Sequence, residues 1–397
     1  MAQSDLVEAK RAKKDEFYTQ YSDIQNEMNA YLEYDPDVFR NKTVLLPCDD
    51  PEWSNFTKFF AQNFENFGLK KLISTSYAVE SKLYKGSYQV SLFEESAPHY
   101  DSNKTRTKGK IFKLDHDTTG DGKIDVEDLE WNYLEGDGDF RSDEIKKLRD
   151  EADIIITNPP FSLFREFLSW IIEAGKQFVI IGNMNAITYK EVFPLIKGNK
   201  MWTGSRFNKR VNGKNMTFYV PDDYDLSGTE VEMANGKKMI SVAGTGWYTN
   251  LEHGRRHQPL SLMSMEDNIK YSKHKEVKGK QYQKYDNYDA IEIPFSDAIP
   301  NDYDGVMGVP ISFLTKHNPD QFVILGSDAD DDTPPIKKYP KKAKVVNGNR
   351  MKSNTGTMGC VIREEEFGSG TYFDVGYPVR AVYKRLFIKH INNENKS

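Results

Sequence analysis

Short apolar runs alternate with helical segments in the first part of the chain. An apolar run at 43–47 ends in turn residues, and a second run follows at 71–77. Between them we expect a helix at 55–67, with Ser54 as its N-cap and Gly68 at its end. Apolar runs this short, bounded by turns, are typical of buried strands. Strand–helix–strand in this order predicts an α/β fold built on a parallel sheet.

The clearest strand, at 152–157, runs directly into Asn158-Pro159-Pro160-Phe161. In open α/β sheets, ligands bind at the carboxyl ends of the strands. The two prolines remove backbone donors and stiffen the loop, which therefore presents carbonyl oxygens without competing N–H groups. The side-chain oxygen of Asn158 and the carbonyl of Pro159 can accept both hydrogens of one planar NH₂ group, with the Phe161 ring beside it. The tetrapeptide predicts a site for a planar amine.

This arrangement suits the methylation of adenine at N6. The N6 lone pair is delocalised into the ring, so the amine is a poor nucleophile. Two acceptors on its hydrogens favour a more tetrahedral nitrogen, whose lone pair can attack a sulfonium methyl group in line. A base inside a duplex must first be flipped out of the stack. Positioning and preorganised dipoles would then contribute most of the catalysis. A stiff turn after a buried strand, without chemistry, is the alternative.

The remaining elements divide the chain into two parts. Further helices are expected at 5–34, 144–151, 163–174 and 189–196, and further strands at 88–93, 108–113, 177–182, 216–220 and 239–250. The last two strands are predicted to be antiparallel, and residues from about 80 to 135 are interpreted as an insertion. From residue 256 the chain is richer in Lys, Tyr and Pro. We therefore predict a catalytic domain at 1–255 and a loop-rich α+β region at 256–397.

Composition excludes several classes of protein. The only two cysteines, Cys48 and Cys360, cannot make a disulfide framework or a zinc cluster, and they favour a reducing, cytoplasmic compartment. The N-terminus lacks the apolar segment of a signal peptide, and no apolar run approaches the roughly 20 residues of a membrane span. The net charge of -6 argues mildly against a nucleic-acid partner. A DNA-binding enzyme, however, needs only a positive face.

Several segments resemble, in order, the motifs of EcoRI-type adenine-specific DNA methyltransferases. Residues 157–162 resemble motif IV of the amino-methyltransferases, and residues 15–19 resemble the N-terminal cofactor motif. Residues 47–56 resemble the first-strand motif of the EcoRI-type family, and residues 138–142 resemble its third motif. The resemblance spans roughly residues 10–330, and the order of the motifs matches the family's arrangement.

One departure from methyltransferases in general supports this particular family. Most methyltransferases carry a glycine-rich loop after the first strand, whereas this chain has Pro47-Cys48-Asp49-Asp50-Pro51. That form is the one expected within the EcoRI-type family. The resemblance implies a Rossmann-like S-adenosylmethionine-dependent methyltransferase sheet followed by a C-terminal target-recognition region.

The same resemblance assigns roles to individual residues. The catalytic loop would be Asn158, Pro159, Pro160 and Phe161, and the cofactor contacts would be Tyr18, Thr19, Cys48, Asp49, Asp139, Phe140 and Asn158. Tyr18 and Thr19 are expected at the methionine end, and Asp49 near the amino acid or the ribose. Asp139 is expected to accept from the adenine amine of the cofactor, with Phe140 flanking the ring. The ribose ligand stays open, because Tyr77 rather than an acid ends the second strand. For Asp139, a solvated loop carboxylate is the alternative.

Residues 117–128 resemble a calcium-binding EF-hand loop. The candidate ligands are Asp117, Asp121, Asp125 and Asp128. Thr119 at the third position and Asp rather than Glu at the twelfth depart from the EF-hand pattern, and the strand-like residues 111–114 argue against a helix–loop–helix. A tight acidic turn is the favoured interpretation, so no metal is expected to take part in the chemistry.

Three basic clusters lie in the second half of the chain. Residues 337–354 hold seven Lys or Arg and no acid, residues 270–284 hold six lysines, and residues 255–257 form the third cluster. Such clusters suit contacts with DNA phosphates, and a solvated face is the alternative for each. The candidate DNA-binding residues are Arg255, Arg256, Lys341, Lys342 and Arg350.

Taken together, the resemblance implies a site-specific, adenine-specific DNA methyltransferase that uses S-adenosylmethionine and acts as a monomer on double-stranded DNA. A restriction–modification system with a cognate endonuclease is the expected setting. Two alternatives stay open. Asn-Pro-Pro-aromatic loops serve planar NH₂ groups in general, so the substrate could be a protein glutamine or an RNA base. The chain could also be an inactive DNA-binding relative, although its intact cofactor motifs argue against this.

Overall fold

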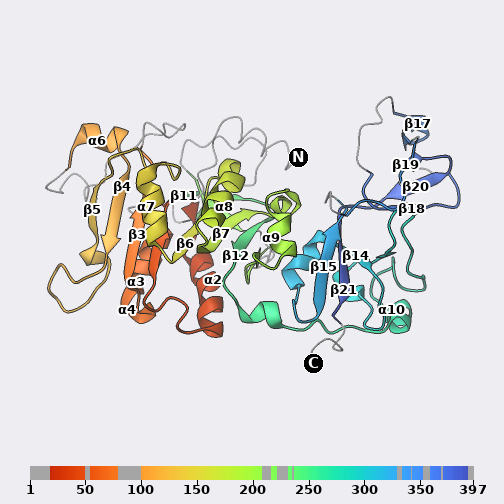
Figure 1. Ribbon diagram of the computed structural model, residues 1–397, viewed down its shortest axis with the longest axis horizontal. Coiled ribbons are helices and arrows are strands. Elements are labelled where there is room, and N and C mark those ends of the chain that lie inside the picture. Colours follow the sequence, from red (N-terminus) through yellow and green to blue (C-terminus); the bar gives the residue numbers. More distant parts are fainter. Residues whose placement is uncertain are drawn as a thin grey trace. The chain divides into compact units, whose positions relative to one another are not determined.

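The computed structural model describes most of the chain, and the described residues form two compact units (Figure 1). The described residues are 18–49, 54–78, 100–207, 216–220, 231–234, 237–328, 333–340, 342–351, 358–367 and 370–391. Unit 1 comprises Met1–Ala186 and Met201–Gly254, and unit 2 comprises Ile187–Lys200 and Arg255–Ser397. The longer segment of unit 2 begins at Arg255, one residue before the predicted boundary. The sequence did not indicate that Ile187–Lys200 belongs to it.

An eight-stranded mixed sheet forms the centre of unit 1, with the strand order β5-β4-β3-β2-β6-β7-β12-β8. The strands are β2 (Thr43–Leu46), β3 (Lys71–Thr75), β4 (Lys110–Leu114), β5 (Glu130–Tyr133), β6 (Ile154–Thr157), β7 (Gln177–Asn183), β8 (Trp202–Thr203) and β12 (Thr245–Thr249). β3, β2, β6 and β7 are parallel. β4 continues the sheet antiparallel on one side, and β12 does so on the other. The predicted parallel core is confirmed.

Helices cover both faces of this sheet (Figure 1). α2 (Tyr21–Tyr34), α3 (Asn55–Gln62) and α4 (Phe64–Phe67) share one apolar core with the side chains of alternate strand residues, including Val44 and Ile156. α7 (Asp143–Glu151) contacts β2. α8 (Phe164–Glu173) contacts β7 and packs on the face of the sheet opposite the core that contains α2, α3 and α4. There α8 lies so close that a Cβ on Gly182 of β7 would stand 2.4 Å from the Phe164 ring.

The helix expected at 55–67 begins and ends as predicted but is divided in two. The hydroxyl of Ser54 accepts a hydrogen bond from the Phe56 amide at 3.0 Å, which is an N-cap. Gly68 ends α4 with φ 61°, the left-handed conformation that favours glycine. Asn63 separates α3 from α4. The conformation of the connection between β2 and β3 is therefore fixed at both ends of the helical segment.

Two expectations about strands differ from the structure. The strand expected at 108–113 belongs to the central sheet rather than to an insertion, because β4 pairs with β3. β5, which was not predicted, pairs with β4. The strand expected at 88–93 lies outside the described residues. The single strand expected at 239–250 is wrong. A turn at Gly244, with φ 70°, divides it into β11 (Lys237–Ser241) and β12.

β11 belongs to a second, four-stranded sheet of unit 1, ordered β1-β9-β11-β10. Its other strands are β1 (Tyr18–Thr19), β9 (Thr217–Tyr219) and β10 (Val231–Ala234). β9 and β11 are antiparallel, as predicted. β1 pairs with β9, so that Thr19 lies opposite Phe218. The start of the described chain is therefore held beside a strand about 200 residues away.

Unit 2 is α+β and contains two small sheets. β13 (Ile291–Glu292), β14 (Met307–Pro310), β21 (Arg385–His390) and β15 (Phe322–Ser327) form the first, in that order. β17 (Asn349–Arg350), β16 (Ala343–Val346), β19 (Thr371–Asp374), β20 (Pro378–Ala381) and β18 (Val361–Arg363) form the second. Its helices include α9 (Phe193–Lys197) and α10 (Met265–Tyr271). Across both units, none of the described helices is long and apolar enough to cross a membrane.

A buried carboxylate joins α2 to the residues that follow β8. Glu27 is fully buried, and its carboxylate accepts hydrogen bonds from the amides of Ser205 at 2.7 Å and Arg206 at 2.9 Å, and from the Tyr31 hydroxyl at 2.8 Å. The approach is close enough that a Cβ on Gly204 would lie 2.2 Å from the Glu27 Oε1. Glu27 thus satisfies two backbone donors far from it in sequence.

We expect Glu27→Ala to lower the free energy of unfolding of unit 1 by about 3 kcal/mol, because two partly buried N–H groups lose their acceptor. Glu33 lies exposed on the same helix, and Glu33→Ala should change the stability by less than about 0.5 kcal/mol. Urea unfolding followed by circular dichroism measures both. Equal effects of the two substitutions would contradict the assigned role of Glu27.

His317 gives unit 2 a dependence on pH. Its Nε2 lies 3.0 Å from the Phe322 carbonyl oxygen, which can only accept, so Nε2 carries the hydrogen. Burial lowers the pKa of His317 to about 4, and the charge of Arg256 acts in the same direction. In the unfolded chain the pKa returns to about 6.5. Between these values the unfolded state binds a proton that the folded state does not, so stability falls as pH falls.

We therefore expect unit 2 to lose stability as the pH is lowered from about 6.5 towards about 4. His317→Gln keeps a side-chain N–H donor but removes the titration, and should flatten this part of the profile. Urea midpoints at a series of pH values measure the effect. A His317→Gln profile as steep as that of the unchanged protein would refute the assignment.

Candidate active site

The Asn-Pro-Pro-Phe segment begins where the central strand β6 ends. β6 closes at Thr157, and Phe161 opens the 3₁₀ helix η2 (Phe161–Leu163), which leads into α8. β6 lies beside β2 in the middle of the sheet. The predicted catalytic loop of Asn158, Pro159, Pro160 and Phe161 thus stands at the carboxyl end of a buried parallel strand, which is where α/β sheets bind ligands.

The Asp49 carboxylate connects this loop to the end of β2. Its Oδ2 accepts a hydrogen bond from the Thr157 hydroxyl at 2.6 Å, and its Oδ1 accepts one from the Ser54 hydroxyl at 2.8 Å. Asp49 is only 7% exposed. Since Thr157 directly precedes Asn158, and Ser54 caps α3, one buried carboxylate positions both the loop and the helix.

Hydroxyl groups on β3 and α3 extend this network. Ser74 donates to the Asp49 carbonyl at 2.9 Å, and its oxygen lies 2.9 Å from the Thr57 hydroxyl. Thr75 donates to the Pro47 carbonyl at 3.2 Å. The turn after β2, which includes the half-buried Cys48, is therefore fixed from the neighbouring strand.

β1 and the Phe161 ring meet in the same region of unit 1. The Asn55 side-chain amide donates to the Thr19 carbonyl at 2.8 Å, which ties β1 to the start of α3. The Phe161 ring packs edge to face against Phe218, with centroids 6.4 Å apart, and Phe218 pairs with Thr19. The Thr19 hydroxyl is buried and has no hydrogen-bond partner within the described part of the chain. A buried hydroxyl of this kind is suited to a polar ligand.

The third predicted motif packs on the end of β3. Gly138 has φ 87°, and a Cβ there would lie 2.2 Å from the Ser76 carbonyl oxygen, so only glycine fits. Arg141 and the Tyr77 hydroxyl donate to the Asp139 carboxylate, at 2.8 Å and 3.3 Å. These bonds, that from Arg141 above all, lower the pKa of Asp139. Burial, with the charges of Asp137 and Asp139, raises the pKa of Tyr77 to about 12.

Phe140 is more buried than its expected role suggests. Its ring packs edge to face against Phe167, with centroids 5.1 Å apart, and against Trp170, with centroids 5.7 Å apart. Sequence reasoning identified Ser54 as a helix cap, and it did not identify Arg141, Ser74 or Thr157 as partners in this region. Only the Ser54 cap had a local signal, because the other three bonds join segments far apart in sequence or depend on side-chain direction.

The acidic loop at 117–128 uses its carboxylates to bind its own backbone. Asp117 accepts from the amide of Gly122 at 2.8 Å, and Asp128 accepts from the amides of Thr118 and Thr119 at 2.8 and 2.9 Å. Asp121 and Asp125 each accept from an amide two residues ahead. Among the residues that the structure describes, no three His, Cys, Asp or Glu side chains are grouped so as to hold a metal.

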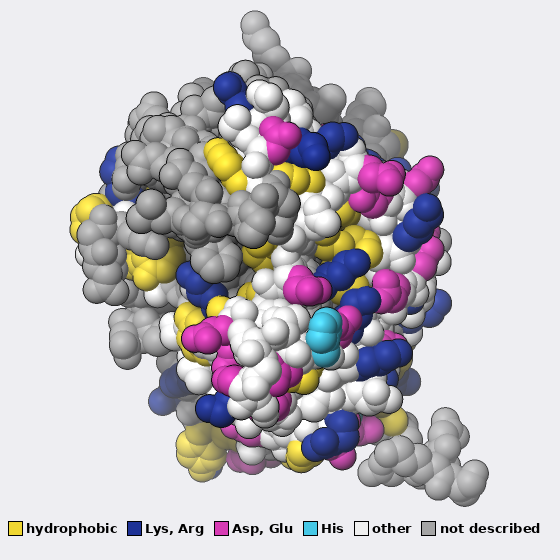
Figure 2. Space-filling view, turned by 90° about the vertical axis from the view of Figure 1, so that its left-hand side faces the viewer, with side chains coloured by type: hydrophobic (Ala, Val, Ile, Leu, Met, Phe, Trp, Pro, Cys, Tyr) yellow, Lys and Arg dark blue, Asp and Glu magenta, His cyan; other side chains and the backbone are white. Residues whose placement is uncertain are grey.

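The predicted DNA-binding residues occupy different environments. Arg256 is buried and donates to Asn199, and Arg350 is ion-paired with Asp374. Arg255 and Lys342 are half-buried, and Lys341 lies outside the described residues. Figure 2 shows the end of unit 1 that carries α6 (Ser102–Thr107), β4 and β5, where acidic and basic side chains are intermingled. Charge does not mark a DNA-binding face at that end.

The chain resembles proteins of one known family over most of its length. It matches the family described as "Adenine-specific methyltransferase EcoRI" over residues 5–390. It is 44% identical over 321 residues to the type II methyltransferase M.EcoRI of Escherichia coli, covering 81% of this chain and 88% of that protein. The type II methyltransferase M.MgeORF184P of Mycoplasma genitalium is 36% identical, covering 80% and 84%. M.MpnI of Mycoplasma pneumoniae is 33% identical, covering 80% and 83%. No solved structure shows a significant match.

The resemblance found in the sequence motifs is thereby confirmed at the level of the family. The match spans nearly the whole chain, and three relatives each align with more than four-fifths of their own length. The chain belongs to the EcoRI family of adenine-specific methyltransferases.

Proposed function

We propose that this chain transfers the methyl group of S-adenosylmethionine to N6 of an adenine flipped out of double-stranded DNA, within a type II restriction–modification system. The observation that carries the proposal is the position of Asn158-Pro159-Pro160-Phe161 at the carboxyl end of β6, held there by the bond from Thr157 to Asp49. The names of the relatives, all type II methyltransferases, supply the DNA context.

The arrangement of the parallel strands supports a Rossmann-like sheet. From β2 the chain goes outward to β3 on one side, and later continues through β6 and β7 on the other side. The order therefore reverses between β2 and β6, and ligands of such sheets bind at that switch point. Asp49 follows β2 and Asn158 follows β6, so both motifs stand beside the switch point.

The cofactor would be held along this edge of the sheet, and it supplies an electrophilic methyl group on sulfur. Thr19, with its buried hydroxyl, and Tyr18 are proposed for the methionine end, with Cys48 and Asp49 nearby. Asp139, kept ionised by Arg141, could accept from the cofactor's adenine amine. Phe140 would contribute through its packing beside Asp139, because its ring is buried against α8.

The chain's own groups then orient the target amine. The Asn158 oxygen and the Pro159 carbonyl accept the two N6 hydrogens, and Pro160 keeps the loop rigid. Phe161, already braced edge to face by Phe218, stacks on the flipped base. No ionised general base is needed before methyl transfer, since the acceptors raise the nucleophilicity of N6 by themselves.

Unit 2 is proposed as the target-recognition region. Arg255, Lys341, Lys342 and Arg350 remain candidates for phosphate contacts. Arg256 is left out of this proposal, because its side chain is buried and bonded to Asn199. Arg350 would have to exchange its ion pair with Asp374 for a phosphate.

We expect Asn158→Ala to lower kcat for DNA methylation by about 100- to 1000-fold, the usual effect of removing one preorganised hydrogen-bonding group. The affinity for S-adenosylmethionine should be largely kept. Asn158→Asp retains an acceptor at the same place and should lose less. Transfer of labelled methyl groups to N6-methyladenine in duplex DNA, with RNA and protein as parallel substrates, measures the activity. Full activity of Asn158→Ala, or label only in RNA or protein, would refute the proposal.

The bond from Thr157 to Asp49 is proposed to position the loop. Thr157→Val keeps the shape of the side chain but removes the hydroxyl, and we expect kcat to fall about 10- to 100-fold, because small misplacements are costly in catalysis. Thr157→Ser, which keeps the donor, should restore most of the rate. Thr245→Val is a matched control, since the Thr245 hydroxyl is equally buried in the same sheet but has no partner among the described residues.

The distinguishing measurement is the split between kcat and cofactor affinity. A positioning role predicts a lower kcat for Thr157→Val with an unchanged dissociation constant for S-adenosylmethionine. If Thr157→Val and Thr245→Val behave alike, the hydroxyl contributes only to folding. Calorimetric titration and steady-state rates at saturating DNA provide the two values.

A further inference from the structure

Unit 2 contains two cavities of similar size that share part of one wall. Their volumes are about 890 Å³ and 870 Å³, and residues 381–383 line both. Tyr383 is 65% exposed and lies on the boundary between them. The two cavities differ in charge, and this difference indicates which of them can receive an anion.

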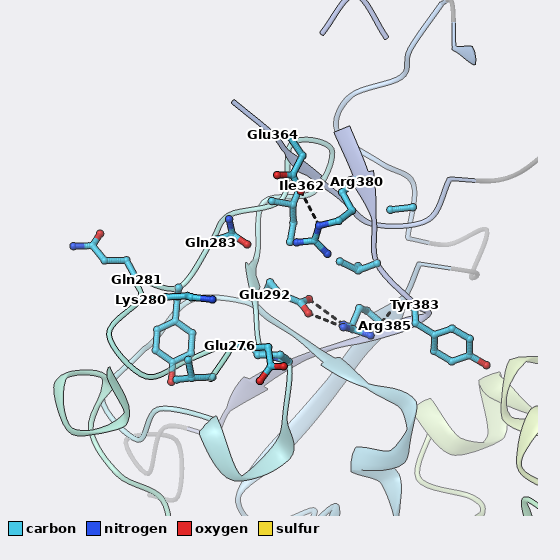
Figure 3. Close-up of a pocket in the computed structure, with 15 residues that line it drawn as sticks. Glu276, Lys280, Gln281, Gln283, Glu292, Ile362, Glu364, Arg380, Tyr383 and Arg385 are labelled. Carbon is cyan, nitrogen blue, oxygen red and sulfur yellow. Dashed lines mark hydrogen bonds and ion pairs between the residues drawn. The ribbon is translucent and has the colours of Figure 1, made fainter. Parts of the chain in front are cut away.

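The first, which we call the paired cavity, is electrically balanced. Its lining holds three cations and three carboxylates. They are Lys280, Arg380, Arg385, Glu276, Glu292 and Glu364. Two of the cations are already in ion pairs, Arg380 with Glu364 at 2.7 Å and Arg385 with Glu292 at 2.6 Å, and both pairs are visible in Figure 3. An anion that binds Arg380 or Arg385 in this cavity would have to displace a carboxylate.

The second, which we call the lysine cavity, has an excess of positive charge. Lys337, Lys338, Lys342 and Lys384 line it, and Asp328 is the one acid among the described lining residues. Asp328 is buried, and its carboxylate accepts from the amides of Arg385 at 3.0 Å and Cys360 at 3.3 Å. Its charge is therefore directed at the backbone.

Not all of these lysines are available to a ligand. Lys337 is ion-paired with Asp286 at 3.0 Å. Lys384 is exposed and donates to the Thr188 hydroxyl at 3.1 Å, and Lys338 is also exposed. Neither Lys338 nor Lys384 meets a carboxylate within the described part of the structure. Among the described residues these two cations thus form no ion pair, although the charge of Lys384 also acts on the Asp328 carboxylate from a distance.

Aromatic rings form part of the walls of the lysine cavity. Tyr288, Tyr339, Phe373 and Tyr383 contribute rings to the lysine cavity. Lysines beside aromatic rings are the combination that proteins use to hold a nucleic-acid strand, with cations on phosphates and rings on sugars and bases. We infer that the lysine cavity binds the phosphodiester backbone of the DNA substrate through Lys338 and Lys384, with Tyr383 packing on the adjoining nucleotide.

This inference rests on the proposed function only in taking DNA as the substrate. It differs from the basic clusters read in the sequence in two ways. Lys384 belongs to none of those clusters, and Lys337 and Arg350, which do, are occupied by Asp286 and Asp374. The fold selects the cations that are left for DNA.

The test is the salt dependence of DNA binding by the full-length protein. Each lysine that contacts a phosphate contributes about 0.9 to the slope of log K against log salt. The double variant Lys338→Ala/Lys384→Ala should therefore lower the slope by about 1.8, and weaken binding about 60-fold at about 0.1 M salt. Fluorescence anisotropy with a labelled duplex of mixed sequence measures this. Arg380→Ala, from the paired cavity, is the matched control and should leave the slope unchanged, because Arg380 is already ion-paired with Glu364.

Tyr383 supplies a second, independent measurement. Tyr383→Leu should weaken binding without changing the slope, whereas Tyr383→Phe should keep the affinity. All these side chains, including that of the Arg380 control, are exposed, and circular dichroism verifies that each variant is folded. An unchanged slope for the double variant, or an equal loss for Arg380→Ala, would overturn the inference. If the double variant lost binding to a mononucleotide but kept duplex binding, the inference would also be overturned, and the cavity would be a nucleotide site.

Methylation of the same duplex by the unchanged protein distinguishes a failure of the cavity inference from a failure of the proposed function. If the unchanged protein methylates adenine while the double variant keeps the salt slope, only the inference about the cavity fails. If the unchanged protein methylates no DNA, the proposed function fails. At saturating DNA, the kcat of the double variant should match that of the unchanged protein, because the lysines hold DNA and do not touch the reacting atoms.

Discussion

The hydrogen bond from Thr157 to the buried Asp49 carboxylate is the interaction on which the proposed site depends. A carboxylate that is 7% exposed is costly unless it is hydrogen-bonded, and here the hydroxyls of Thr157 and Ser54 satisfy both oxygens. The same atoms therefore stabilise the fold and set the geometry of the loop. The position of Asn158 therefore depends on how firmly this bond holds the end of β6 beside the end of β2.

Unit 2 illustrates the same principle with opposite charges. Arg385 and Glu292 are each 9% exposed and bind one another, and the Tyr285 hydroxyl also donates to Glu292. Such a pair adds little net stability, but neither partner can be removed without leaving a buried charge. The fold thus pairs Arg385, Arg380, Lys337 and Arg350 internally, so these four cations are not left free for a polyanion.

Local signals predicted much of unit 1. Apolar runs marked β2, β3, β6 and β7, Ser54 marked the start of α3, and Gly68 marked the end of α4. The prediction failed where pairing across long distances decides. Residues 239–250 read as one strand, yet Gly244 lets β11 and β12 join different sheets. Phe140 lies in a matching motif, yet its ring packs against α8. The prediction failed because the direction of a side chain cannot be read from its neighbours in sequence.

The sequence by itself determined the chemistry that the chain can attempt. A strand ending in Asn158-Pro159-Pro160-Phe161 specifies two rigid acceptors and an aromatic face, since proline removes donors wherever it stands. Tertiary structure alone decided which groups support that loop and which charges remain free. Asp49 and Thr157 are 108 positions apart in the sequence. Nothing in the sequence around Arg256 indicates that its side chain is buried in the folded protein. Hydrogen bonds and ion pairs act over a few ångströms in space, so only the folded chain determines which residues interact.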